Sequence, residues 1–382
     1  GRVRSVPGIL PIALEAKKHG FQACVVSKEN ESEGRLVEGI EVIGVENLKA
    51  TCDVLNGWGV TDQMEITTVK YPKDHTYELD YQDIKGQKLA KRAAEVAVAG
   101  NHNMLMIGPP GAGKTMIAKR IPTILPPLTK EESMELTKLY SIVGGLNANR
   151  PLILERPFRE VHHTATKSAL IGGGLIPRPG EISLADKGVL FLDEIAEFQK
   201  PVLEMLRQPL EEHFIKIIRN RGVYHFPAEF LLVAAMNPCP CGNYPNLNKC
   251  LCTSTQIQAY LSKISQPLLD RIDICVEAER VAYEDLQGAR EEYSKDIRER
   301  VIMARERQKE RYKGESITTN SQLNAEKIKQ YCILGNEEEK MMRQAFDKLN
   351  LTARMYHKIL CVARTIADLA GEEKISLSHL RE

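Results

Sequence analysis

The stretch Gly108-Pro109-Pro110-Gly111-Ala112-Gly113-Lys114-Thr115 fits the phosphate-binding pattern G-x-x-x-x-G-K-[ST] at every constrained position. Before it, Met104 to Ile107 is an apolar run of strand length, and after it Thr115 to Ile121 has the pattern of a helix that Pro122 stops. A loop between a strand and a helix is the context that this motif requires. The stretch therefore predicts a nucleotide-binding α/β protein, against the alternative of a glycine-rich turn that matches by accident.

The residue types of this loop suit phosphate chemistry. Glycines at 108, 111 and 113 let backbone N–H groups turn toward phosphate oxygens, and the helix N-terminus adds partial positive charge. We expect Lys114 to reach the β- and γ-phosphates and the Thr115 hydroxyl to ligate Mg²⁺. The predicted phosphate-binding residues are Gly108, Pro109, Pro110, Gly111, Ala112, Gly113, Lys114 and Thr115.

A second apolar run, residues 188–192, delivers Asp193 and Glu194 at its C-terminal end. Ligands of open α/β sheets lie at the carboxyl ends of the strands. We expect Asp193 to hold Mg²⁺ and Glu194 to orient and polarise the attacking water. An acidic pair at a solvated strand end is the alternative, but its position after a phosphate loop favours the catalytic interpretation.

Two further segments carry polar groups of interest. Residues 230–235 form a third apolar run that ends near Asn237, whose amide could hold the attacking water. Farther on, Arg271 stands between two aspartates in Leu268-Leu269-Asp270-Arg271-Ile272-Asp273. From the residues alone, Arg271 is equally compatible with a surface salt bridge.

This order of parts resembles the AAA+ ATPases, and more narrowly their magnesium-chelatase-like branch, the ComM or YifB family. The resemblance covers nearly the whole chain. It is carried by the following segments: Asp83-Ile84-Lys85-Gly86-Gln87, His102-Asn103, His162-His163-Thr164, Gly172-Gly173-Gly174, Met236-Asn237-Pro238-Cys239-Pro240-Cys241-Gly242 and Ala363-Arg364-Thr365-Ile366-Ala367-Asp368.

The resemblance implies roles that spacing alone does not give. Asn237 is similar to the sensor-1 residue, and Arg271 to the arginine finger that reaches the ATP site of the neighbouring subunit. Arg354 is similar to sensor 2, and Ile84 and Gly86 to residues that contact the nucleotide. The family also implies an ATP-dependent homo-oligomer, most often a hexameric ring, in which hydrolysis depends on assembly.

The helix that would carry Arg354 is also predicted from the residues. Thr352 is a suitable N-cap, and Gly371 follows the end. An apolar stripe faces a core along Met355, Ile359, Val362, Ile366 and Leu369. Arg354 lies off the stripe, which suits either a residue that bridges a helical lid to the γ-phosphate or an exposed helix arginine.

Residues 162–174 resemble the helix-2 insert of this AAA+ clade, a loop that such motors can point into a central pore. Glycines 172 to 174 give it mobility and little bulk. Metal binding by His162 and His163 is disfavoured, because no further ligand stands at a suitable spacing.

Four of the nine cysteines form the pattern C-x-C-x8-C-x-C: Cys239, Cys241, Cys250 and Cys252. Four thiolates can close a tetrahedral zinc site, although the usual knuckle is C-x-x-C. Free thiols, an iron–sulfur cluster and redox disulfides are the alternatives. We expect the other cysteines, at 24, 52, 275, 332 and 361, to be small buried apolar residues, and the cysteine usage favours a reducing compartment.

Composition limits the remaining possibilities. The formal net charge is +1, so any DNA contact must come from local patches such as Arg156, Arg159 and Lys167, or Lys216, Arg219 and Arg221. Solvated charged faces are the alternative for both patches. No apolar run approaches the length of a membrane span, and we expect a soluble, cytoplasmic protein with no membrane partner.

We predict four regions. Residues 1–58 resemble part of a Lon-protease-like α/β domain that begins in mid-fold, which suggests a trimmed chain. This part is proteolytically inactive, because Leu10 stands where active Lon proteases carry lysine and no Ser-Lys dyad can be built. Residues 59–79 are a linker, 80–280 the AAA+ core with its helix-2 insert and cysteine loop, and 281–382 a helical lid.

The expected function is an ATP-hydrolysing, Mg²⁺-dependent ring motor. By resemblance its substrate is single-stranded or branched DNA, with helicase or branch-migration activity during natural transformation and recombination. One alternative is a motor that remodels a protein partner, as metal-chelatase ATPases do. Another is an ATP-gated scaffold without significant turnover, with residues 239–252 as a docking knob.

Overall fold

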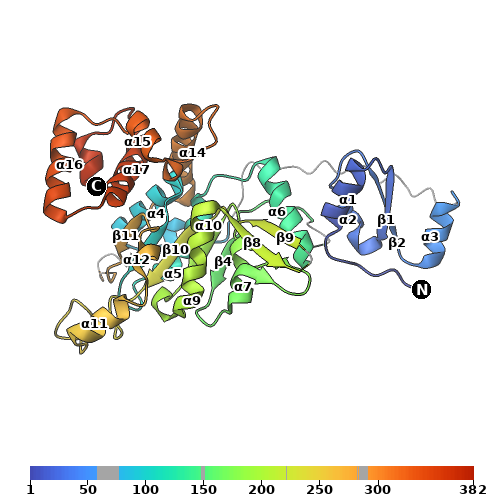
Figure 1. Cartoon of the computed structure of the whole chain (residues 1–382), viewed down its shortest axis with the longest axis horizontal. Coiled ribbons are helices and arrows are strands. Elements are labelled where there is room, and N and C mark those ends of the chain that lie inside the picture. Colours follow the sequence, from blue (N-terminus) through green and yellow to red (C-terminus); the bar gives the residue numbers. More distant parts are fainter. Residues whose placement is uncertain (58–76, 148–150, 221, 282, 284–290) are drawn as a thin grey trace.

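The computed structural model describes residues 1–57, 77–147, 151–220, 222–281, 283 and 291–382 (Figure 1). A small N-terminal unit lies at one end, a sheet with its helices in the middle, and a group of helices at the other end. The linker predicted at 59–79 falls largely outside the described residues.

The middle part is built on a five-stranded sheet in which every neighbouring pair is parallel. Its spatial order is β11-β3-β10-β7-β4. In chain order the strands are β3 (Met104–Ile107), β4 (Phe158–Val161), β7 (Val189–Leu192), β10 (Leu231–Met236) and β11 (Ile274–Glu277). Every residue of β7 and β10 is buried, as expected for strands covered on both faces. The predicted parallel sheet is confirmed.

Side chains alternate between the two faces of this sheet. Val189 and Phe191 pack with α4 (Lys88–Gly100), α5 (Lys114–Ile124) and α14 (Ser294–Arg311). Leu190 and Leu192 pack on the other face. That face is covered by α6 (Lys130–Val143), α7 (Lys167–Ile171), α8 (Glu181–Leu184), α9 (Lys200–Leu203), α11 (Ser254–Leu261) and α12 (Gln266–Leu269), with α10 (Arg207–Glu212) beside them.

Helix α5 does not stop at Pro122 as predicted, but continues to Ile124. A proline in a helix removes one backbone hydrogen bond. Here Ile121 and Ile124 on either side of it are fully buried in the core. Their burial offsets the lost bond, so the last turn forms.

Two short hairpins stand next to each other on the middle part. One pairs β5 (Gly172–Gly173) with β6 (Arg178–Pro179), and the other pairs β8 (Phe214–Arg219) with β9 (Gly222–Pro227). A Cβ added to Gly173 would lie 3.2 Å from Arg219 Nη2, so the hairpins touch. The insert predicted as a loop at 162–174 thus contains helix α7 and one strand of a hairpin.

The C-terminal helices form their own core. That core is formed by α15 (Ala325–Tyr331), α17 (Ala353–Ala370) and α18 (Leu377–Arg381), while α16 (Asn336–Leu349) packs beside α18 and α14 belongs to the core of the sheet. Thr352 caps α17 and Gly371 ends it with a φ of 80°, as predicted. None of the described helices is both long and apolar enough to cross a membrane.

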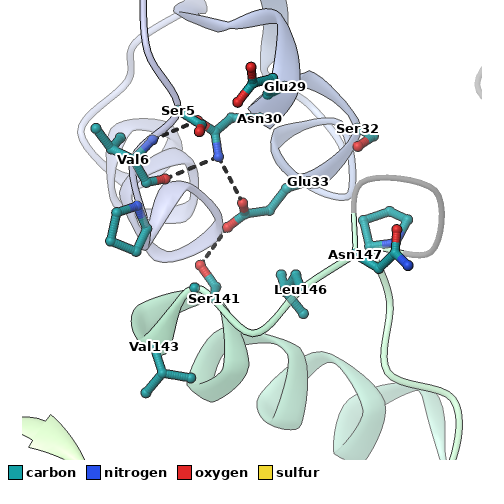
Figure 2. Close-up of a pocket in the computed structure, with 13 residues that line it drawn as sticks. Ser5, Val6, Glu29, Asn30, Ser32, Glu33, Ser141, Val143, Leu146 and Asn147 are labelled. Carbon is teal, nitrogen blue, oxygen red and sulfur yellow. Dashed lines mark hydrogen bonds between the residues drawn. The ribbon is translucent and has the colours of Figure 1, made fainter.

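The N-terminal unit contains α1 (Ile9–Lys18), β1 (Ala23–Ser27), α2 (Glu31–Gly34), β2 (Glu41–Val45) and α3 (Leu48–Leu55), with β1 and β2 parallel. Buried Glu33 accepts hydrogen bonds from Leu10 N, Asn30 Nδ2 and Ser141 Oγ of α6 (Figure 2). A cavity of about 330 Å³ lies in this seam. The seam ties the unit to the sheet through α6.

The five remaining cysteines follow the prediction only in part. Cys332 and Cys361 are buried, whereas Cys52 and Cys275 are exposed, so the prediction was wrong for these two. Cys52 lies on α3, which has no buried residue, and Cys275 is an exposed position of the edge strand β11. An apolar sequence neighbourhood does not identify which face of an edge element is covered.

Candidate nucleotide-binding site

The phosphate loop joins β3 to α5 at the carboxyl edge of the sheet. A Cβ on Gly108 would come within 2.1 Å of Ala278 O, so only glycine fits there. Gly111 and Gly113 have φ values of 77° and 86°, which favour glycine as well. The two glycines that the motif requires, Gly108 and Gly113, and the additional Gly111 are therefore each fixed by a close approach or by backbone conformation.

Lys114 begins α5 and is largely buried, with 8% of its surface exposed. Its Nζ donates to Gly108 O at 2.6 Å, to Pro109 O at 3.0 Å and to Asn237 Oδ1 at 3.3 Å. Burial lowers the pKa of Lys114, although the charges of Asp193 and Glu194 act in the opposite direction. The structure thus brings two predicted residues, Lys114 and Asn237, together at the mouth of the loop.

Thr115 and Asp193 form the next contact. Thr115 Oγ1 donates to Asp193 Oδ2 at 2.8 Å, and Asp193 Oδ1 accepts from Glu194 N at 2.9 Å. A hydroxyl and a carboxylate are hard oxygen ligands of the kind that Mg²⁺ prefers. The donor set therefore fits the predicted metal.

Strand register explains why these side chains converge. Leu192 pairs with Val161 on one side and with Ala234 on the other, while Met236 pairs with Ile107. Groups that directly follow β3, β4, β7 and β10 therefore meet at one edge. Asn237 follows Met236, and Asp193 follows Leu192.

The same register brings His163, two residues after β4, beside Glu194, two residues after β7. His163 Nδ1 lies 3.7 Å from Glu194 Oε2, and Glu194 has a left-handed φ of 51°. The sequence pattern indicated a structural or pore-lining role for His163 in preference to metal binding, and it did not predict this contact. The signal was its distance from the end of its strand, which matches that of Glu194.

Residues 84–87 border the loop from the other side. Gln87 Nε2 donates to Ala112 O at 2.7 Å. Ile84 is buried and its carbonyl accepts from Lys91 Nζ, and Gly86 N donates to Glu291 Oε1 at 3.1 Å. Of this segment, Gln87 makes the direct loop contact, although the prediction named only Ile84 and Gly86.

The two other predicted arginines pair with residues outside the phosphate loop. Arg271 is paired with Glu211, donates to Pro267 O, and has 12% of its side chain exposed. Arg354, which is 73% exposed, donates to Asp270 Oδ2 at 3.4 Å. Both arginines thus have partners in their own chain, and the partner of Arg354 is Asp270, the residue that precedes Arg271.

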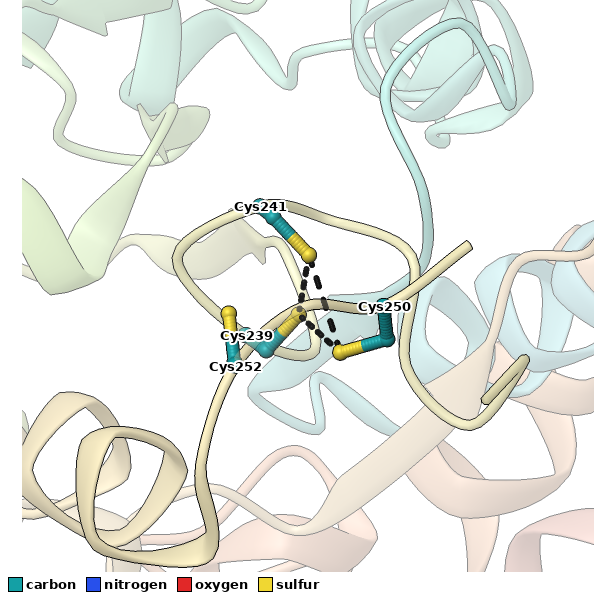
Figure 3. Close-up of side chains that lie close together, drawn as sticks. All are labelled: Cys239, Cys241, Cys250 and Cys252. Atoms are coloured by element: carbon teal, nitrogen blue, oxygen red, sulfur yellow. Dashed lines mark hydrogen bonds between the residues drawn. The ribbon is translucent and has the colours of Figure 1, made fainter. Parts of the chain in front are cut away.

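The predicted cysteine cluster comes together in space. The Sγ atoms of Cys239, Cys241, Cys250 and Cys252 all lie within 4.8 Å of one another (Figure 3). Their loop directly follows Asn237.

The description "Magnesium chelatase, subunit ChlI" belongs to a family model that matches residues 80–286. A second, "Magnesium chelatase, subunit ChlI C-terminal", matches residues 291–382. The chain belongs to the magnesium-chelatase family of AAA+ ATPases. The resemblance predicted from the motifs is therefore confirmed, and so is the AAA+ fold with its C-terminal helical region.

Full-length relatives place the chain more narrowly within this magnesium-chelatase family. It is 42% identical to "Competence protein ComM" of Haemophilus influenzae over 388 residues, which covers 100% of this chain and 74% of that protein. It is 39% identical to "Uncharacterized protein YifB" of Escherichia coli over 387 residues, with the same coverage. A shorter match is to "ATP-dependent protease ATPase subunit HslU" of Enterococcus faecalis. The two chains are 34% identical over 125 residues, which cover 26% of this chain and 27% of that protein. Family membership supports an ATPase.

Proposed function

We propose that this protein is an ATP-hydrolysing motor that assembles into a ring and acts on DNA. The observation that carries the ATPase part is the convergence of Lys114, Thr115, Asp193 and Asn237 at one edge of the sheet. Lys114 and the loop amides bind the phosphates, and Asn237 with Glu194 positions the attacking water. Thr115 and Asp193 hold Mg²⁺, which neutralises charge on the phosphates.

The ring proposal rests on Arg271. Its guanidinium is paired with Glu211 on an exposed part of α10, where Glu211 has 58% of its side chain accessible. In a ring, Arg271 leaves this partner for the ATP of the neighbouring subunit, and Arg354 acts as sensor 2. We propose a hexamer, divided as above into residues 1–58 as a Lon-like part, 59–79 as a linker, 80–280 as the core and 281–382 as the lid.

The DNA proposal is supported by the similarity to a competence protein and by one surface. Lys216 and Arg219 are exposed on β8, and Leu175 and Ile176 are 86% and 72% exposed at the tip of the adjacent β5–β6 hairpin. The other basic patch considered from the sequence is largely occupied, because Arg156 bonds Glu132 and Arg159 bonds Glu181. Arg221 lies outside the described residues.

The test is steady-state ATPase activity titrated with single-stranded, duplex and forked DNA at several salt concentrations. Each phosphate contact contributes about −0.9 to the log–log salt slope on duplex DNA and about −0.7 on single strands. Replacing Lys216 and Arg219 by alanine should flatten the slope by about two contacts, whereas Lys348→Ala on the exposed face of α16 should leave it unchanged. ATPase activity that does not change with any of the added DNAs would favour the alternative, a motor that remodels a protein partner. A wild-type assembly that binds ATP but shows no turnover would favour the ATP-gated scaffold.

A further inference from the structure

The four thiols of residues 239–252 are arranged as the corners of a coordination site. Cys239 Sγ lies 3.4 Å from Cys241 Sγ and 3.8 Å from Cys250 Sγ, and Cys241 and Cys250 are 3.6 Å apart (Figure 3). A tetrahedral ion with Zn–S bonds of about 2.3 Å sets its sulfurs about 3.8 Å apart. The three measured edges thus match one face of such a tetrahedron, and Cys252 Sγ stands within 4.8 Å of all three.

Disulfides account for this arrangement less well. A disulfide joins sulfurs in twos, whereas the three contacts here close a triangle among Cys239, Cys241 and Cys250. Two N–H groups also point at the sulfurs, Tyr244 N at Cys239 Sγ (3.4 Å) and Asn243 Nδ2 at Cys241 Sγ (3.8 Å). Hydrogen bonds to ligand atoms are the usual support of a metal site. The cluster is therefore built to hold thiolates.

We propose that Cys239, Cys241, Cys250 and Cys252 bind one zinc ion, and that this ion braces the phosphate loop. The bracing contact is between Gly242 and Pro110, since a Cβ on Gly242 would lie 2.5 Å from Pro110 Cδ. Gly242 sits between two ligands and Asn237 precedes the first by two residues. The ion therefore fixes a segment that contacts the loop at Pro110 and reaches Lys114 through Asn237. The bracing of the phosphate loop, unlike the zinc site itself, rests on the proposed nucleotide-binding function.

The experiment compares the full chain, purified without chelator or metal-affinity tag, with Cys250→Ser and with Cys275→Ser, an exposed cysteine outside the cluster. Elemental analysis should find about one zinc per chain in the wild type and in Cys275→Ser, and about a tenth of that in Cys250→Ser. Because Cys250→Ser could fail to fold, Co²⁺ exchange into the wild-type protein gives an independent reading. The visible spectrum should show thiolate-to-cobalt charge transfer and the intense bands of a tetrahedral site.

A finding of iron with acid-labile sulfide would overturn the zinc site. The site would also be overturned if the protein contained neither zinc nor iron and the cobalt-treated protein showed no tetrahedral bands. For the brace, a fluorescent ATP analogue should bind Cys250→Ser several-fold more weakly than Cys275→Ser. Zinc loss with unchanged analogue affinity would overturn the brace. No binding of the analogue to the zinc-loaded wild type would instead count against the proposed function, so the two failures can be told apart.

Discussion

His163 and Glu194 are side-chain partners, with His163 Nδ1 3.7 Å from Glu194 Oε2. The imidazole is held from two sides, because His162 lies at a ring-centroid distance of 4.0 Å and Phe198 meets it edge-on at 6.5 Å. His163 also precedes α7, which leads into the β5–β6 hairpin whose tip carries the exposed Leu175 and Ile176. The proposed general base is thus in contact with the segment that leads into the hairpin of the proposed DNA-binding surface.

Replacing Glu194 by glutamine should stop hydrolysis while leaving ATP binding intact. The amide keeps the size of the side chain but cannot polarise water, and removal of a general base costs about 10²–10⁴-fold in rate. Steady-state turnover and binding of a fluorescent ATP analogue measure the two effects separately. Glu197→Gln, at an exposed neighbouring carboxylate paired with Lys263, is the matched control. Normal turnover by Glu194→Gln would remove this residue from the mechanism.

His163→Ala should lower kcat by about tenfold with little change in KM, because the imidazole positions Glu194 and does not touch the phosphates. His163→Asn, which retains a hydrogen-bonding group near the same place, should recover part of the lost rate. His19→Ala is the control, since His19 is an exposed histidine of the N-terminal unit that pairs with Glu15. Equal rates for His163→Ala and His163→Asn would indicate a packing role instead.

Arg271→Ala should abolish turnover in the assembled ring and leave nucleotide binding near the wild-type value. The reason is that an arginine finger stabilises transition-state charge in the neighbouring subunit and is worth about 10³–10⁵ in kcat. Mixing Arg271→Ala with Glu194→Gln chains should restore partial activity, because some interfaces then combine an intact finger with an intact base. Arg343→Ala, an exposed arginine on α16, serves as control. Loss of ATP binding in Arg271→Ala would place this side chain inside its own subunit's site.

The loop and the strands of the site were predictable because local rules determine them. A glycine pattern and short apolar runs identified the loop, β7 and β10 to within a residue or two. Contacts between distant segments were not predictable in the same way. The pairing of Arg271 with Glu211 and of Gln87 with Ala112 depends on how helices lie on the sheet. The contact of His163 with Glu194 is an intermediate case. The sequence indicates where the two strands end, and knowledge of the strand order would then have placed His163 beside Glu194.

Asp368→Ala should strongly destabilise the C-terminal helices. Asp368 is fully buried and accepts from Arg311 Nη1 at 2.9 Å and from Asn320 Nδ2 at 2.9 Å, with Arg364 Nη2 at 3.2 Å. Removing one member of a buried ion pair leaves uncompensated charge and costs about 3–5 kcal/mol. Urea unfolding, and limited proteolysis of the lid, should show the loss. Glu310→Ala, at the exposed pair with Lys313, should leave both readouts unchanged.

Asp186 predicts a pH dependence of stability. It is fully buried, its Oδ1 accepts from Glu229 N at 2.7 Å, and its Oδ2 has no hydrogen-bond partner among the described residues. Burial raises the pKa of Asp186 to about 6, more than the Glu229 hydrogen bond and the Lys187 charge lower it. A raised pKa means that the folded protein holds this proton more tightly than the unfolded chain does. The contribution of Asp186 is therefore most favourable below the usual pKa of about 4 and is lost as the pH rises through 6.

The Asp186→Asn variant isolates this effect, because an amide does not titrate. Between pH 4 and pH 7 the wild type should lose about 2–3 kcal/mol of unfolding free energy relative to Asp186→Asn. The difference between their urea midpoints measures this, and Asp347→Asn on the exposed side of α16 should run parallel to the wild type at every pH. A difference that stays constant across this range would mean that folding leaves the pKa of Asp186 near its unfolded value of about 4. Burial of the carboxylate would then have to be offset by a partner at Oδ2.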